Sequence, residues 1–574
     1  MGLSLQRRRL YLENKMASDH ERYASTRRDF LKLVGGGAGV LLSAGTGYAH
    51  HHGKPMPQSL PYLDQQTYTS NMEIVARLPG NDRANRSAGP IMAIGSNRYM
   101  ISSGDMLDIT DPLNVKIAQR GGVPGGELAY HAQAKKWMIM QSVQAPHDFY
   151  NMPFGKYEDA AAIKAFRVNK EFRGVRMWDA SDPSNVVRVS ELNTGPTGFG
   201  VHGDQCYWDG GKYAYIAASS DDSFTGMLSC IWPQAVYLMV LDVSDPASVT
   251  KVSEWWVPGM KNTEVAQLKR WKCVAGRADA LPEDVMTMEE SIEAFKEYVV
   301  PNYPAPDRLP FTALHGPVSV PTRVENGGTL AYGSWSNFGM LVHDLSDITK
   351  PNLIGTFDPS PTYGWEAIPF HTIWMGTLPR GFVVGISESL NPDCNEEYLP
   401  NWVIDVRDPR NPVPIATLER PKAPPEAPFT DFCQRRGRFS AHKPPYLASP
   451  GRMSQTFLPV EYFNAGIRCY DLSEPTQPKE VGYFVPPMGG TLSPECRVPT
   501  ADLQGADKEH CAEESLGFVR PCNSIAVEWD RNVMYAGTTT GLYVLTSPAL
   551  GKPNFSAMPV TEWALPDVNI GAPV

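Results

Sequence analysis

The chain has 574 residues, including 49 Gly and 51 Pro, and a formal net charge of −10. So many Gly and Pro residues favour turns and short strands over long helices. An aromatic share of 10% excludes a disordered chain, and the negative charge disfavours a broad nucleic-acid-binding surface. Without an unbroken apolar run of about 18 residues, the sequence also predicts no transmembrane span in the mature chain.

Residues 1–49 have the features of an export signal. The motif is Thr26-Arg27-Arg28-Asp29-Phe30-Leu31-Lys32, followed by a Gly-rich apolar stretch that ends at Ala49. It resembles the twin-arginine signal, and small residues at its end suit signal peptidase. We therefore expect the twin-arginine export machinery to deliver the chain to the periplasm or beyond, with residues 50–69 as a tail. A chance arginine pair before a short helix and an uncleaved anchor remain alternatives.

A repeat occupies most of the remaining chain. Each copy is a hydrophobic strand that ends in Asp, followed by a turn of the Ser/Thr-Asp-Pro type. The strand-ending residues are Asp108, Asp179, Asp242, Asp344, Asp405 and Asp471, and residues 543–548 form a decayed seventh copy. Because these Asp residues recur in every unit, we interpret them as turn formers and not as catalysts.

The repeat predicts an all-β fold, a seven-bladed β-propeller that spans residues 70–574. Units of three or four strands cannot bury both faces alone, and closing them into a ring leaves only short edges. A β-sandwich with coincidental turns is the alternative. Long spacings predict insertions near 142–172, 255–312, 420–440 and 485–520, with one helix over 282–299.

Two strand sequences resemble a known repeat family. They are Gly174-Val175-Arg176-Met177-Trp178-Asp179 and Gly466-Ile467-Arg468-Cys469-Tyr470-Asp471. Both look like LVIVD repeats, and the likeness extends over most of residues 70–550. Among propellers, the selenium-binding protein and methanethiol oxidase group is a more distant resemblance. That resemblance implies copper bound by histidines and a sulfur-containing substrate.

Five histidines precede the first strand of five successive blades. They are His131, His202, His315, His371 and His442, and Asn523 takes the same place in the seventh blade. The innermost strand of a blade lines the channel of a propeller, so equivalent positions form a ring around the axis. Imidazoles in one ring can converge on a transition metal. Copper is the first choice, with iron and zinc as alternatives, and isolated structural roles for each histidine are the competing interpretation.

Three carboxylates follow these histidines and are candidates for proton transfer. They are Asp204, Glu388 and Glu461, and ordinary turn or capping roles are open for each. The sequence thus predicts an exported, metal-dependent oxidoreductase that acts on a small molecule. A non-catalytic scaffold and a zinc or iron hydrolase or lyase are the alternatives.

The nine cysteines all follow residue 49. An oxidising periplasm permits disulfides, and an odd number leaves at least one thiol outside any internal pair. Cys496, Cys511 and Cys522 cluster in one stretch, where a local bridge is an option that the sequence leaves open.

Overall fold

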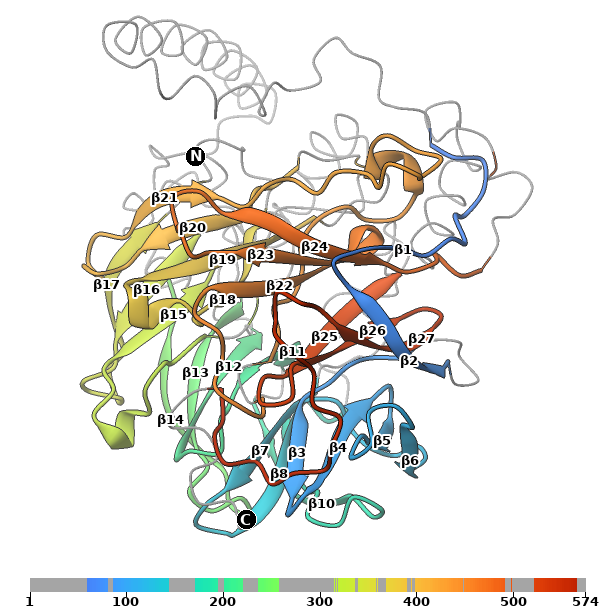
Figure 1. Ribbon diagram of the computed structural model, residues 1–574. Coiled ribbons are helices and arrows are strands. Elements are labelled where there is room, and N and C mark those ends of the chain that lie inside the picture. The colour runs from blue at the N-terminus through green and yellow to red at the C-terminus, as the bar shows by residue number, and fades with distance from the viewer. Residues whose placement is uncertain are drawn as a thin grey trace, which may run out of the picture. The chain divides into compact units, whose positions relative to one another are not determined.

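The structure is a computed structural model, shown in Figure 1, and its sheets confirm the predicted all-β fold. It describes residues 59–80, 86–143, 171–194, 201–219, 236–257, 314, 316, 318–335, 339–357, 359, 368–389, 394, 398–446, 449–490, 497 and 521–564. Within these ranges the strands form six four-stranded sheets and one three-stranded sheet, all antiparallel. No helix in the described ranges is long and apolar enough to cross a membrane.

Each sheet is one blade, and in the first five blades the strands run outward in chain order. The first three blades contain β3 (Ile91–Ile94), β4 (Asn97–Ser102), β5 (Asp105–Asp108) and β6 (Lys116–Gln119); β7 (Glu127–His131), β8 (Lys136–Val143), β9 (Gly174–Asp179) and β10 (Val187–Asn193); and β11 (Val201–Tyr207), β12 (Tyr213–Ser219), β13 (Val236–Asp242) and β14 (Thr250–Trp255). The next two contain β15 (Leu330–Ser334), β16 (Met340–Asp344) and β17 (Asn352–Phe357); and β18 (Ile368–Trp374), β19 (Phe382–Glu388), β20 (Trp402–Asp405) and β21 (Val413–Thr417).

The last two blades combine segments from both ends of the chain. The sixth contains β22 (Phe457–Tyr462), β23 (Gly466–Asp471), β24 (Lys479–Val485) and β1 (Tyr68–Ser70), and the seventh contains β25 (Cys522–Glu528), β26 (Val533–Thr538), β27 (Gly541–Thr546) and β2 (Glu73–Pro79). Short 3-10 helices span Val324–Asn326, Leu378–Arg380, Phe432–Arg435 and Phe463–Ala465. Antiparallel pairing of β2 with β27 joins the two ends of the chain within one blade.

The repeated Asp residues form turns, as the sequence predicts. Each accepts a hydrogen bond on its side chain from the backbone N–H two residues later, at 2.8–3.0 Å in all six copies. This Asx geometry reverses the chain between the third and fourth strands. The same β-bulge lies beside it in every blade, including the seventh, where Thr546 replaces Asp. The decayed copy is therefore a complete blade.

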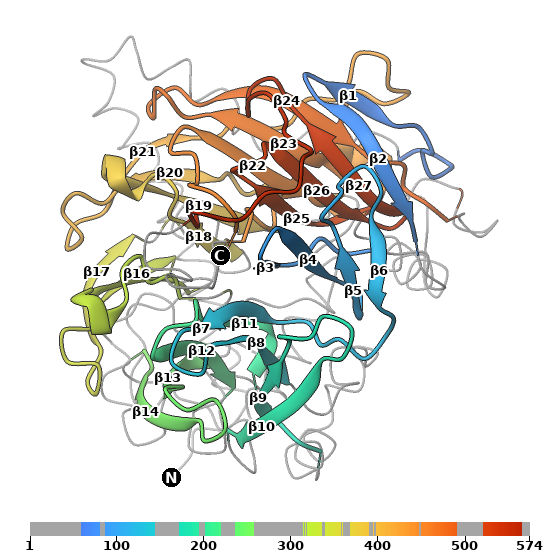
Figure 2. The same ribbon diagram turned by 60° about the horizontal axis from the view of Figure 1, so that its bottom comes forward.

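The inner strands of neighbouring blades contact one another. Contacts join β3 to β7, β7 to β11, β15 to β18 and β22 to β25. Figure 2 shows β3, β7, β11, β18 and β25 toward the middle of the ring of sheets, with β6, β10, β14, β17 and β21 at the rim. In the fourth and sixth blades single bridges, Ser319↔Tyr332 and Lys443↔Glu461, mark the innermost position.

The N-terminal part of the propeller is fixed by buried charges. Asp64 accepts a hydrogen bond from the Arg435 Nε atom at 3.1 Å, and both side chains are buried. Arg98 in the first blade binds Glu528 in the seventh at 2.6 Å, again with both side chains buried. The fold therefore includes residues ahead of position 70, where the sequence placed its start.

Several predictions from the sequence concern residues outside the described ranges. Residues 1–58, the expected helix at 282–299 and most of the insertions near 142–172, 255–312 and 485–520 lie outside the described residues. The insertion near 420–440 is described and contains the 3-10 helix Phe432–Arg435. A disulfide joins Cys394 to Cys433, and the thiols of Cys206, Cys469 and Cys522 are buried and unbridged. Cys522 thus does not take part in a local bridge.

Candidate metal centre

Four residues predicted from the sequence lie close together in the fifth and sixth blades. His371 lies on β18 and Glu388 ends β19 of the same blade, while His442 precedes β22 and Glu461 lies on it. All four residues are at most 5% exposed. The β18–β19 register changes between Ile368↔Glu388 and Thr372↔Ile386. His371 therefore lies in an irregular stretch of its strand, where strict alternation of side chains is broken.

Three side chains offer ligand atoms to a common point. One atom each from His371, Glu388 and His442 lies within 4.8 Å of the others. The Nε2 atom of His371 is 3.9 Å from Oε2 of Glu388, and Nε2 of His442 is 3.8 Å from Oε1 of the same carboxylate. The two imidazole centroids are 4.5 Å apart. This arrangement is compact enough for two imidazoles and one carboxylate to bind a single ion.

His442 is held by a carboxylate on its other side. Its Nδ1 atom lies 2.8 Å from Oε2 of Glu461, and the backbones of the two residues are also hydrogen-bonded, at 2.9 Å. The ring stacks on Phe463 at a centroid distance of 4.6 Å. When Nδ1 donates its proton to Glu461, the Nε2 lone pair faces the cluster. Carboxylate–histidine pairs of this kind orient metal ligands.

Glu388 is oriented by a cation. The Arg438 Nη1 atom donates to Oε1 of Glu388 at 2.8 Å, and both side chains are buried. This contact leaves Oε2 on the side of His371. Two carboxylates and one guanidinium give these buried groups a formal charge of −1 when both imidazoles are neutral, and a bound cation would offset it.

His131 is not brought to this cluster. It ends β7, where its Nε2 atom is 2.8 Å from the carbonyl oxygen of Val243, and its Nδ1 atom accepts from the Ala134 N–H at 3.0 Å. Both ring nitrogens are thus occupied by backbone groups of a turn and of the neighbouring blade. His131 therefore has no ring nitrogen left to bind a metal ion, and the expectation that it is a ligand is not supported.

For the other predicted site residues, His202, Asp204 and His315, the structure describes at most the backbone. His202 and Asp204 lie on β11, whose register to β12 changes between Val201 and Cys206, and their side chains lie outside the described part. His315 also lies outside it. Its neighbour Gly316 has φ +83°, and a Cβ there would be 1.6 Å from the His371 carbonyl oxygen. Gly316 therefore approaches the backbone of β18 too closely for a side chain. Ligand roles for His202 and His315 stay predictions.

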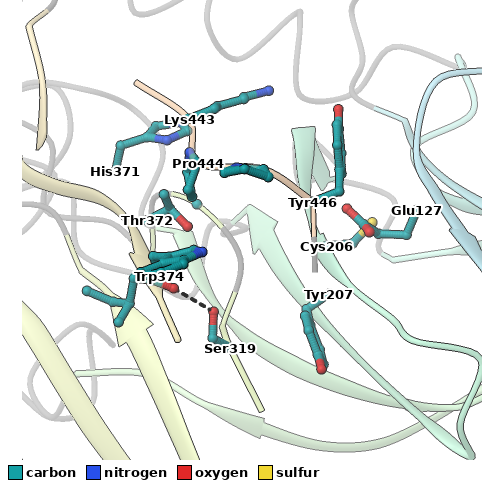
Figure 3. A pocket seen from close by; sticks show the side chains of 13 residues that line it. Glu127, Cys206, Tyr207, Ser319, His371, Thr372, Trp374, Lys443, Pro444 and Tyr446 are labelled. Atoms are coloured by element: carbon teal, nitrogen blue, oxygen red, sulfur yellow. Dashed lines mark hydrogen bonds between the residues drawn. The ribbon is translucent and has the colours of Figure 1, made fainter. Parts of the chain in front are cut away.

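A cavity adjoins the cluster. Its volume is about 80 Å³, and His371 and Lys443 line one side. Glu127, Cys206 and Tyr446 lie on the other side, as Figure 3 shows. Neither Glu127 nor Arg438 was predicted from the sequence. Glu127 opens the inner strand that ends at His131, a position that could have marked it, whereas no local pattern marks Arg438.

Comparisons with known proteins support the repeat. The family profile described as LVIVD repeat matches residues 230–255. No curated protein matches the chain. Solved structures similar to it include Raptor from Chaetomium thermophilum, at 7% identity and a TM-score of 0.38, over 85% of this chain and 30% of that one. The chain thus spans about a third of the length of Raptor.

Another similar structure is a propeller. It is the β-propeller domain of Cps50 (Swd1) from Myceliophteria thermophila, at 9% identity and a TM-score of 0.37, over 81% of this chain and 97% of that one. Identities this low say nothing about function. The repeat match and the sheet topology together carry the conclusion that this chain is a seven-bladed β-propeller containing an LVIVD repeat.

Proposed function

We propose that this propeller binds a redox-active transition metal through His371, His442 and Glu388, and oxidises a small molecule at that centre. The observation that carries the proposal is the convergence of three buried ligand atoms within 4.8 Å of one another. Two imidazoles and one carboxylate are a ligand set for non-haem iron, and imidazole also suits copper. A sulfur compound is the substrate class that the resemblance suggests.

The chain's own residues have distinct roles in this proposal. A bound ion would supply the electron-transfer chemistry. Glu461 fixes the tautomer of His442 through the 2.8 Å contact at Nδ1, and Arg438 holds Glu388. The cavity beside His371 provides room for a substrate. Glu461 is also placed to hold a proton that leaves His442 Nδ1.

A zinc-dependent hydrolase is the second candidate. Two histidines and one glutamate are also the ligands of catalytic zinc in several hydrolases. The same three residues, His371, His442 and Glu388, support it. The identity of the ion separates the two candidates, because zinc has no redox chemistry.

Metal analysis of the exported protein, purified without chelators, tests the proposal. We expect about one copper or iron ion per chain. His371→Ala and His442→Ala should each reduce that content strongly, while His343→Leu, at a buried histidine away from the cluster, should leave it unchanged. One zinc ion per chain would favour the hydrolase. A protein without metal in every variant would instead be a scaffold.

Export by the twin-arginine route is part of the proposal. The motif at residues 26–32 and the disulfide between Cys394 and Cys433 support it, because disulfides persist in oxidising compartments. Replacing both arginines, Arg27→Lys with Arg28→Lys, should retain the protein in the cytoplasm. Unchanged periplasmic yield in cell fractionation would contradict this route.

A further inference from the structure

The cavity beside the candidate metal centre has two chemically different sides. Inner segments of several blades build it: β7 contributes Glu127, β11 contributes Cys206, and β18 contributes His371. The segment before β22 adds Tyr446. In Figure 3, Glu127, Cys206 and Tyr446 lie together on the side away from His371. A molecule in the cavity would touch the histidine at one end and this trio at the other.

The size of the cavity limits what it can hold. Its volume of about 80 Å³ is several times the roughly 10–15 Å³ that a cavity needs to hold one water molecule. Much of the remaining lining is apolar, including Trp374, Ile373 and Pro444. A molecule of a few non-hydrogen atoms with apolar parts therefore fits.

The trio on the far side is uncharged at neutral pH. Burial raises the pKa of Glu127 to about 8, against a smaller opposing effect of the Lys443 ammonium. Burial also raises the pKa of the Cys206 thiol to about 12, with the Glu127 carboxylate adding to the shift. The pKa of Tyr446 is raised by burial as well. The carboxylic acid, the thiol and the phenol are then all protonated hydrogen-bond donors.

No side-chain hydrogen bond reaches the carboxyl group of Glu127 in the described part of the chain, whereas its backbone bonds the Cys206 thiol. Burial raises the pKa of this carboxyl group, and the charge of Lys443 opposes the shift. A half-buried carboxylic acid that lines a cavity is thus available to an incoming acceptor. Unsatisfied polar groups in such surroundings are costly, so a ligand that accepts its proton would gain affinity.

We propose that the cavity is the substrate pocket and that it selects a small, uncharged molecule with a hydrogen-bond acceptor, which Glu127 anchors as a donor. This proposal rests on the proposed function and names the substrate class of the same centre. The apolar lining contacts the remainder of the molecule. His371 lies at the opposite end, so the anchored molecule faces the candidate ligands.

A matched pair of probes tests the charge and acceptor preference. Dimethyl sulfone and methanesulfonate have similar size and shape, and they differ by one negative charge. Saturation-transfer NMR on the mature protein as purified, at pH 7, should show binding of the sulfone and weaker binding of the sulfonate. Tighter binding of methanesulfonate would overturn the proposal, because it would mean that Lys443 receives an anion there.

The pH dependence identifies Glu127. With a pKa of about 8, its protonated fraction, and the affinity for the sulfone, should fall about tenfold between pH 7 and pH 9. Glu127→Gln keeps a donor at every pH and should abolish that loss, while the exposed control Glu191→Gln should keep it. A tenfold loss that persists in Glu127→Gln would contradict the anchoring role.

The proposals for the pocket and for the metal centre can be refuted separately. The NMR titration is repeated with His442→Ala, which is expected to lose the ion and to retain sulfone binding. A bound ion without sulfone binding would refute the pocket alone. Sulfone binding in a protein that never holds metal would refute the proposed function and leave the pocket in place.

Discussion

The Nδ1 atom of His442 lies 2.8 Å from the Oε2 atom of Glu461, on the strand that pairs with its own segment. This contact gives one imidazole of the cluster a defined orientation. It also makes Glu461 a positioning residue, since the ligand atoms of the cluster belong to His371, Glu388 and His442.

Replacing Glu461 should weaken metal binding without removing a ligand. In Glu461→Gln the neutral amide favours a proton on Nδ1 of His442 less strongly than the carboxylate does, and we expect the metal affinity to fall about 10- to 100-fold. Competition with a chelator measures it. The control is Glu480→Gln, at a glutamate paired with Arg468 on the outer side of the same blade, and it should retain wild-type affinity. Equal affinities in all three proteins would contradict the positioning role.

Removing the disulfide should destabilise the fold near the centre. Cys394 lies six residues after Glu388, and Cys433 lies five residues before Arg438. The bridge closes a loop with a sequence separation of 39 residues, and its loss should cost about 4 kcal/mol of unfolding free energy. Urea unfolding of the Cys394→Ser, Cys433→Ser double variant measures the change. Identical midpoints for wild type and variant would show that the bridge does not stabilise the protein.

His343 should make the protein sensitive to acid. Its imidazole is fully buried against Trp255, and its nitrogens have no hydrogen-bonding partner in the described ranges. Burial lowers its pKa to about 3, so below pH 6.5 the unfolded chain binds a proton that the folded one refuses. Stability is therefore lost as the pH falls, by about 2 kcal/mol at pH 5.

The variant His343→Leu should remove that part of the acid sensitivity. The comparison is thermal unfolding of wild type and variant at pH 7 and pH 5. The advantage of the variant should be larger at pH 5. An advantage that does not change with pH would mean that burial does not lower the pKa of His343 in the folded protein.

Glu127 should lower the stability of the folded protein as the pH rises, in contrast to His343. Its pKa is raised to about 8, so above its ordinary value of 4.5 the unfolded chain releases a proton that the folded chain keeps. The folded state loses stability as the pH rises from about 4.5 to 8, by on the order of 2 to 4 kcal/mol. Glu127→Gln should thus unfold at a higher temperature than wild type at pH 8, and the two should converge near pH 4.5. A difference independent of pH would contradict the raised pKa.

The fold could be predicted because its signals are local. Each Asp turn depends on a hydrogen bond across two residues, as between Asp242 and the Ser244 N–H, and a short motif encodes it completely. Seven such units imply a ring. The decayed copy was recognisable because its hydrophobic strand and the following Ser547-Pro548 persist without the Asp.

The site was predictable only in part, because it depends on contacts between blades. His371 and His442 were identified by register, and Glu388 and Glu461 by their position on the following strands. His131 has the same register, but its ring is bound by the carbonyl of Val243, 112 residues away in sequence. Arg438 reaches Glu388 across 50 residues, and no local pattern indicates that pairing.

Anomalous diffraction from crystals of the purified protein, at the absorption edge of the metal found by elemental analysis, would locate the bound ion. We expect one peak among Nε2 of His371, Nε2 of His442 and Oε2 of Glu388, and no peak there in His371→Ala crystals. No peak at this position in the wild type, or a peak at other side chains only, would contradict the proposed metal centre.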